Sequence, residues 1–213
     1  MLLNTKNWTT SSPAGSLAIS SFPSPTTAGV AGNFTVTAYN SNGTIDTGYT
    51  GTVHFTSSDP QAVLPADYTF TAADAGVDTF SATLKTAGTQ SITVTETAMS
   101  TITGKDTGIT VNPAAASKFI ITAPSSVPAG VAFALTVKVE DTYGNVVTGY
   151  RGTIRISSVN GQGNLPSTYT FTTKDNGVHT FAGVVLNKRA KHIITMTDTL
   201  DGTIVSSVIV DVL

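Results

Sequence analysis

Few side chains in this chain are able to do chemistry, and its three histidines come first. His54, His179 and His192 are each a candidate general base or metal ligand. The 213 residues include no cysteine, which excludes disulfides, thiolate metal sites and cysteine nucleophiles. Neither a Gly-x-Ser-x-Gly nucleophile motif nor a Gly-x-x-x-x-Gly-Lys phosphate loop occurs. We therefore expect a protein that is not an enzyme.

The acids most relevant to a metal site are Asp74 and Asp175. Each stands two residues before a glycine and just ahead of an expected strand, where a carboxylate accepts backbone N–H groups of a turn. No oxygen-ligand run such as Asp-x-Asp-x-Asp-Gly is present, so a structural turn role is favoured over calcium. We expect no cofactor, and calcium, kept as the alternative, would bind loops near the junction of the two halves of the chain.

Lys188, Arg189 and Lys191 form the one basic cluster of the sequence. A solvated turn is the simpler interpretation, and contact with an anionic glycan is the alternative. Trp8 and Tyr143 are further candidate binding residues, since an aromatic ring stacks on a sugar. No aromatic stacking platform accompanies the basic cluster, so we expect no nucleic-acid partner.

All of these residues belong to a chain that is one unit written twice. A shift of 101 positions gives 25 identities over the 53 residues from 28 to 80. A residue that the fold needs should recur at this offset, whereas a residue that serves one local site need not. None of the three histidines is repeated, because His54, His179 and His192 align with Arg155, Asp78 and Gln90. We therefore expect three isolated surface histidines.

The elements that position these residues are predicted to be β-strands. Serine and threonine make up 59 residues and alternate with β-branched and aromatic residues, as in half-buried strands. Seven strands are expected in each copy, at 17–22, 33–39, 51–57, 68–71, 78–84, 90–96 and 102–111, then at 118–122, 133–140, 152–158, 169–172, 179–186, 192–198 and 204–212. This spacing predicts an all-β fold of two tandem immunoglobulin-like antiparallel β-sandwiches.

Residues 17–113 and 117–213 are the two expected domains, and 114–116 form a short linker. The linker is short and lacks glycine, which favours an elongated arrangement. Residues 1–16 are expected to be a polar arm, or the edge of a longer chain, because they lack the apolar run of a signal peptide. No segment is apolar enough for membrane insertion.

Repeated aromatic residues mark the expected cores. Inward-facing side chains are predicted at two phenylalanine pairs, Phe70 with Phe171 and Phe80 with Phe181. A second repeated feature is a tyrosine between two glycines, Tyr49 and Tyr150, which predicts a bent corner with an anchored phenol.

Charge divides unevenly between the copies. Residues 17–113 carry seven acids and two bases, a balance of −5, and residues 117–213 carry six acids and eight bases, a balance of +2. The simpler interpretation is that the charge of solvent-exposed faces varies because the fold constrains it only weakly. The alternative is charge complementarity between successive repeats.

Several strings together resemble a known family. They are Thr-Gly-Tyr-x-Gly-Thr-Val at 47–53, Ser-Ser-Asp-Pro at 57–60, Leu-Pro-x-x-Tyr-Thr-Phe-Thr at 64–71, Asp-x-Gly-Val-x-Thr-Phe at 74–80 and Ile-Thr-Val-Thr at 92–95. The sequence resembles the bacterial immunoglobulin-like (Big or filamin-like) repeats of extracellular surface or secreted proteins. The resemblance implies a non-enzymatic stalk, spacer or adhesion module located outside the cell or on its surface. Its expected partners are neighbouring repeats, identical subunits, or a cell-surface protein or glycan.

Two other functions fit the same fold. The first alternative is a subunit of a filament, pilus-like fibre or virion that assembles through residues 1–16. The second is a carbohydrate-binding accessory of a secreted hydrolase, in which sugar binding would depend on Trp8, Tyr143 and the basic cluster.

Overall fold

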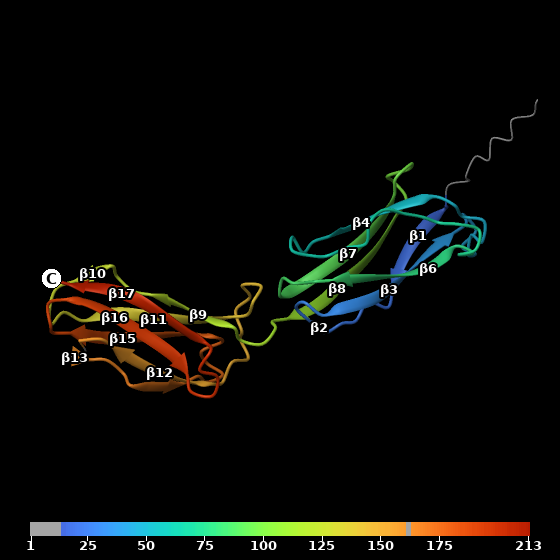
Figure 1. Ribbon diagram of the computed structural model, residues 1–213. Helices are drawn as coiled ribbons and strands as arrows, with labels where there is room; N and C mark the ends of the chain where they lie inside the picture. The colour runs from blue at the N-terminus through green and yellow to red at the C-terminus, as the bar shows by residue number, and fades with distance from the viewer. Residues whose placement is uncertain (1–13, 161–162) are drawn as a thin grey trace, which may run out of the picture. The chain divides into compact units, whose positions relative to one another are not determined.

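The computed structural model describes residues 14–160 and 163–213. The chain divides into two compact units, residues 1–112 and 113–213. Each unit pairs a five-stranded sheet with a smaller sheet, and Figure 1 labels the strands. The chain is all β and consists of two immunoglobulin-like sandwiches, which confirms the predicted fold class.

In the first unit the smaller sheet has the order β1-β3-β6 and the larger sheet has the order β2-β8-β7-β4-β5. The strands are β1 (Ser16–Ser20), β2 (Thr26–Thr27), β3 (Ala31–Tyr39), β4 (Thr52–Ser57), β5 (Tyr68–Thr69), β6 (Val77–Thr83), β7 (Gly88–Glu96) and β8 (Thr103–Asn112).

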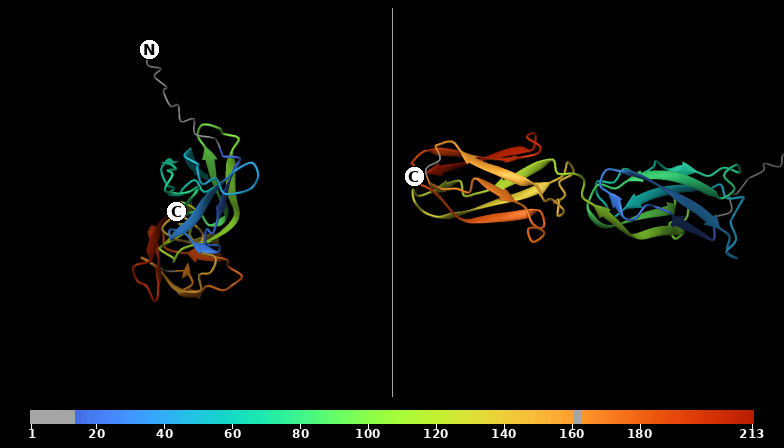
Figure 2. Two further views of the ribbon diagram at one scale, coloured as in Figure 1. Left: turned by 90° about the vertical axis from the view of Figure 1, so that its right-hand side faces the viewer. Right: turned by 90° about the horizontal axis from the view of Figure 1, so that it is seen from below.

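In the second unit the smaller sheet has the order β13-β15-β11-β9 and the larger sheet has the order β10-β17-β16-β12-β14. The strands are β9 (Lys118–Thr122), β10 (Ser126–Val127), β11 (Phe133–Glu140), β12 (Thr153–Ser158), β13 (Gly163–Asn164), β14 (Thr168–Thr170), β15 (Val178–Leu186), β16 (Lys191–Asp198) and β17 (Val205–Val212). Figure 2 shows the strands of each unit running roughly along one direction within that unit, as in an aligned sandwich.

All fourteen predicted strands overlap an observed strand, and their bounds differ by no more than two residues at either end. Three strands of two residues, β2, β10 and β13, were not predicted. β2 pairs in parallel with β8, through Thr26 with Val111 and Thr27 with Asn112, and β10 pairs with β17 in the same way. Each sandwich therefore contains one short parallel pair among its antiparallel strands.

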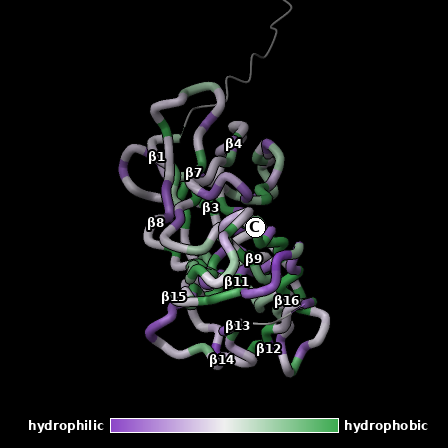
Figure 3. Tube along the Cα trace, turned by 90° about the vertical axis from the view of Figure 1, so that its left-hand side faces the viewer, coloured by the Kyte–Doolittle hydropathy of each residue, from purple (hydrophilic) through white to green (hydrophobic). Residues whose placement is uncertain are grey.

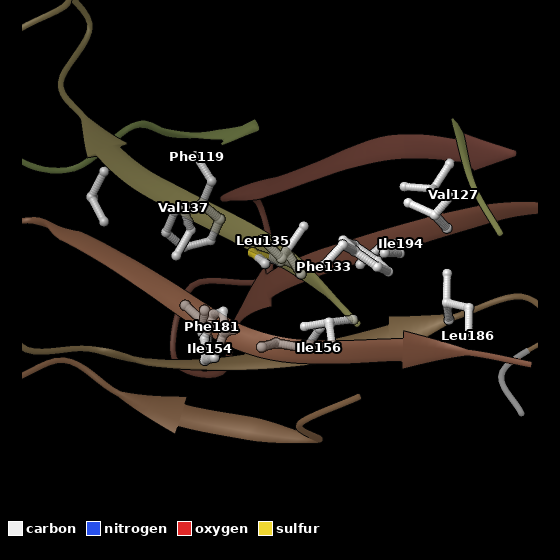
Figure 4. Close-up of a cluster of buried hydrophobic side chains, with 14 of the residues drawn as sticks. Phe119, Val127, Phe133, Leu135, Val137, Ile154, Ile156, Phe181, Leu186 and Ile194 are labelled. Atoms are coloured by element: carbon white, nitrogen blue, oxygen red, sulfur yellow. The ribbon is translucent and has the colours of Figure 1, made fainter. Parts of the chain in front are cut away.

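Alternation along the strands builds the two cores. Val53 and Phe55 of β4 are buried and His54 between them is exposed, as the alternation predicts. Figure 3 shows short hydrophobic stretches alternating with hydrophilic ones along the chain. Figure 4 shows core side chains of the second unit, among them Leu135, Ile154, Phe181 and Ile194, between its sheets. No helix in the described part of the chain has the length and apolar character needed to cross a membrane.

Candidate functional site

The repeated tyrosines form a corner at one end of each sandwich. The Tyr49 ring packs on Phe70 with ring centroids 5.1 Å apart, and Tyr150 packs on Phe171 at 5.0 Å. A Cβ added at Gly51 would clash with the phenol of Tyr49, because it would lie only 2.5 Å from the phenol oxygen. The glycine two residues after each tyrosine, Gly51 or Gly152, is therefore needed for space.

The two corners differ in their hydrogen bonding. The Tyr150 hydroxyl donates to Asp198 Oδ2, and the amides of Leu200 and Asp201 donate to Asp198 Oδ1 at 2.7 and 3.1 Å. In the first unit Glu96 replaces the aspartate, and the Tyr49 hydroxyl and Glu96 Oε2 are buried without a hydrogen-bond partner in the described residues. Among the described residues, a hydrogen bond thus anchors the phenol only in the second unit.

The pKa values of the two corner acids move in opposite directions. Burial raises the pKa of Glu96 above its usual value, against one opposing hydrogen bond from the Ala14 amide. Burial also acts to raise the pKa of Asp198, but the hydrogen bonds from Tyr150, Asp201 and Leu200 outweigh it and lower that pKa. The carboxylate is stabilised by its surroundings in the second unit and disfavoured in the first.

This contrast gives a prediction. Tyr150→Phe removes a hydrogen bond to a charged acceptor and should lower the free energy of unfolding of the second unit by about 1.5–3 kcal/mol. Tyr49→Phe is the matched control, and it should be neutral or slightly stabilising because that hydroxyl has no partner to lose. Calorimetry of both variants measures the effect, and equal losses in the two variants would contradict the assignment.

Asp74 and Asp175 occupy the same turn in the two copies. Asp74 Oδ2 accepts the amide of Thr71 at 2.6 Å, and Asp175 Oδ2 accepts the amide of Thr172 at 2.6 Å. Tyr68 donates to Asp74 at 3.2 Å, and its hydrogen bond to Asp78 is the main cause that raises the pKa of Tyr68 to about 12. The geometry of both aspartates is that of a turn cap.

His179 belongs to this turn in the second unit. Its Nδ1 lies 2.7 Å from Asp175 Oδ1, and its ring stacks on Tyr169 with centroids 3.7 Å apart. A base held by a carboxylate resembles half of a hydrolytic triad. No hydrogen bond between His179 and a serine or threonine hydroxyl is observed in the described residues. The contacts of His179 tie the turn to its strand and do not assemble a nucleophile.

The expectation of three surface histidines was wrong for His192. His54 is exposed and pairs with Asp67 at 2.6 Å, and His179 is partly buried, but His192 is completely buried. Its Nε2–H donates to the carbonyl of Lys188 at 2.8 Å, so its Nδ1 is free to accept from Ser158 Oγ at 3.2 Å.

Gln90, which stands at the place of His192 in the first unit, makes equivalent hydrogen bonds. Gln90 accepts a hydrogen bond from Ser58 Oγ at 2.6 Å and donates to the Thr86 carbonyl at 3.1 Å. Each side chain therefore links the end of one strand, β4 or β12, to the turn that precedes its neighbour in the sheet, β7 or β16. This role recurs although the residue type does not, so comparing the copies by identity missed it.

The candidate binding residues do not form one site. Lys188 and Arg189 are exposed on the turn that leads into β16, and Lys191 is exposed at the start of that strand. Tyr143 is partly buried in the loop after β11. The same connection between β11 and β12 contains Tyr150, which bonds to Asp198 at the far end of β16 from the basic turn. Trp8 and residues 1–13 of the predicted arm lie outside the described residues. The structure thus separates Tyr143 from the basic turn.

Two buried acids that sequence analysis did not select are Asp59 and Asp141. Asp59 accepts the amides of Gln61 and Thr86 at 2.8 and 2.9 Å, and also that of Lys85. Such carboxylates are occupied by the protein's own donors. In the described residues, no three acidic or histidine side chains are grouped so as to hold a metal ion.

The fold and its polar side chains define a class, a tandem of immunoglobulin-like β-sandwiches. No family model matches the sequence, and no curated protein matches it. Solved structures match, among them the Escherichia coli adhesin FdeC, with 17% identity over 95% of this chain and a TM-score of 0.44. The Yersinia pseudotuberculosis adhesin InvE matches with 18% identity over 92% and a TM-score of 0.39. A β-glycosidase from Bacteroides vulgatus matches with 11% identity over 92% and a TM-score of 0.43.

All three are bacterial proteins whose sequences are less than 20% identical to this chain. The aligned region is 65% of FdeC, 58% of InvE and 24% of the β-glycosidase. The chain thus spans less than two thirds of each of these proteins.

Proposed function

We propose that this chain is a non-enzymatic extracellular module whose two sandwiches act as a stalk or spacer and offer an interaction surface. The observation that carries the proposal is the parallel pair found in each unit, β2 with β8 and β10 with β17. In each pair, a strand near the start of the unit runs beside the strand that ends it.

Parallel pairing decides how tension acts on a unit. When the two ends of a unit are pulled apart, antiparallel neighbours can open one hydrogen bond at a time, whereas a parallel pair is loaded along its length. In the first unit the ladder is extended by the Ala28 amide, which donates to the Asn112 carbonyl at 2.8 Å. In the second unit the Ala129 amide donates to the Leu213 carbonyl at 3.0 Å. Resistance to pulling is the property that a spacer needs.

The polar side chains of the interior support the same proposal. The repeated acids Asp74 and Asp175 accept hydrogen bonds of their own turns, and Asp198 anchors the corner of its unit. These carboxylates are occupied by hydrogen-bond donors of the fold itself. The interaction surface of the module is therefore sought among residues that differ between the copies.

Single-molecule pulling tests the proposal. The chain should unfold in two steps, each releasing about 300 Å of extended polypeptide for a domain of this size. Ala28→Pro removes the amide donor of the first unit and should lower the force of one step. The other step belongs to the unchanged second unit and serves as the internal control.

Ala129→Pro is the reciprocal variant and should weaken the other step. Unfolding at low force in the unchanged protein, or unfolding forces that neither proline alters, would contradict a mechanical role for the parallel pairs.

A further inference from the structure

The outer face of the larger sheet in the second unit carries a row of exposed aliphatic side chains. Val159, Ile193 and Ile209 lie side by side across the sheet, because the Val159 amide donates to the Ile193 carbonyl at 3.2 Å and Ile193 pairs with Ile209. Their exposed fractions are 60%, 42% and 58%. We call these three residues the aliphatic row.

The first unit shows that the fold does not require this row. Ser58, Ser91 and Thr107 occupy the same three places, since the Ser58 amide donates to the Ser91 carbonyl and Ser91 pairs with Thr107. Exposing three adjacent aliphatic side chains where hydroxyl residues serve equally well is typical of a contact surface.

Cations stand beside the aliphatic row. Lys191 is two residues before Ile193 on β16 and thus faces the same side of the sheet. Lys188 and Arg189 are exposed on the turn that leads into this strand. In the part of the chain that the structure describes, no carboxylate lies within ion-pair distance of these three residues, although Asp211 faces Lys191 in register. We call Lys188, Arg189 and Lys191 the basic rim.

The first unit carries a surface of the opposite charge. Ile45 is 45% exposed, and its side chain and the Asp46 carbonyl lie against Gly76, which stands between Asp74 and Asp78. Ile45 and these three half-buried acids form what we call the acidic patch, in which Asp74 and Asp78 also accept hydrogen bonds from nearby backbone amides. The corresponding residues of the second unit are Val146, Val147, Asp175 and His179. The patch is therefore as specific to the first copy as the aliphatic row is to the second.

We propose that the aliphatic row and basic rim of one chain bind the acidic patch of a second copy. The two surfaces are complementary in charge, and each has exposed aliphatic carbon beside its charges. They also belong to different units, so each chain carries one surface of each kind. This inference is independent of the spacer function and of residues 1–16.

The contact should be weak. Three partly exposed aliphatic side chains and their rims cover much less than the roughly 800 Å² per partner of a stable interface. Self-association is therefore expected at protein concentrations on the order of 0.1–1 mM, and tandem copies would strengthen it. Added salt should weaken it, because opposite charges attract one another across the contact and the Debye length falls from about 10 Å at 0.1 M to about 3 Å at 1 M.

The first experiment is sedimentation equilibrium of the full chain over this range at low and high salt. The expected result is an average mass that rises with concentration and falls with salt. The triple variant Val159→Ser, Ile193→Ser and Ile209→Thr carries the residues of the first copy and should weaken association at least tenfold, on the order expected for three buried aliphatic groups. Leu200→Ser is the matched control, because Leu200 is 92% exposed but lies outside the row.

The second experiment exchanges the charges. One variant carries Lys188→Glu, Arg189→Glu and Lys191→Glu, and the other carries Asp46→Lys. Asp74 and Asp78 are left unchanged because each accepts a backbone amide of its own segment and a hydrogen bond from Tyr68. Each variant alone should lose self-association, and an equimolar mixture should regain it.

Three results would overturn the proposal. They are a monomer at every concentration, a triple variant that associates as well as the Leu200→Ser control, and a mixture that associates no better than its components. Heparin binding through the basic rim by a chain that stays monomeric would assign this surface to an anionic glycan instead.

Discussion

Phe80→Ala is expected to lower the free energy of unfolding of the first unit by about 3–5 kcal/mol. Phe80 is buried, and its ring lies 4.8 Å from Phe55, 5.1 Å from Tyr68 and 5.9 Å from Phe34, measured between centroids. These rings come from β3, β4, β5 and β6, so the change removes a contact shared by both sheets. The remaining rings cannot all move into the space that Phe80 fills, and a cavity remains.

Chemical denaturation measures the change, with Val63→Ala as the control. Val63 is a similar apolar truncation in the same unit, but it is 53% exposed and should cost less than about 1 kcal/mol. A loss below about 1 kcal/mol for Phe80→Ala would mean that β6 does not present this side chain to the core.

Much of the fold could be predicted because strand alternation is a local property of the sequence. Val53 and Phe55 point inward and His54 points outward because successive side chains of a strand face opposite sides. The second copy repeats this order with Ile154 and Ile156, which separates the constraint from chance. β2 and β10 escaped prediction because a pair of residues has no period to detect.

The polar interior could not be predicted in the same way, because its partners are distant in the sequence. His192 occupies an inward position of β16, but it was assigned to the surface because histidine is polar and is not repeated as histidine. Its burial depends on Ser158, which is 34 residues away, and on the Lys188 carbonyl. Gln90 meets the same two requirements with a different side chain. A comparison of hydrogen-bonding capacity between the copies, rather than of residue identity, would have found the pair.

The corner acids show a similar limit. Glu96 and Asp198 align as equivalent acids, yet Asp198 accepts the Tyr150 hydroxyl and two amides whereas Glu96 keeps one buried oxygen without a partner in the described residues. The two side chains differ by one methylene group and are followed by turns of different sequence. Sequence alignment treats the two residues as interchangeable, but the geometry of a buried carboxylate does not.

Asp141→Ala is expected to destabilise the second unit by about 3–5 kcal/mol, since each buried donor left without a partner costs about 1–3 kcal/mol. The Asp141 carboxylate is fully buried in the loop after β11. It accepts the amides of Ala114, Tyr143 and Asn145 and the side-chain amide of Asn145, all at 2.8–2.9 Å. These bonds hold both the loop and the first residues of the unit.

The first copy offers a matched control for this change. Asn40 stands at the corresponding place, is exposed, and donates through its side-chain amide to Thr44 and Ile45 at 3.3 and 3.4 Å. Asn40→Ala should therefore cost no more than about 1 kcal/mol. Similar losses from both substitutions would show that the buried carboxylate of Asp141 has no special role.

The effect of Asp141→Ala should also depend on pH. Burial alone would raise the pKa of Asp141, but the hydrogen bonds from Asn145, Ala114 and Tyr143 outweigh it and lower that pKa below its usual value. Asp141 thus stabilises the folded unit above the pKa of the unfolded chain, near 4, and this contribution is lost as the pH falls toward the folded pKa. The stabilities of the unchanged protein and the variant, measured by denaturation from pH 7 downward, should therefore approach each other in acid. A constant difference between them would mean that the lost stability comes from packing and not from the ionised carboxylate.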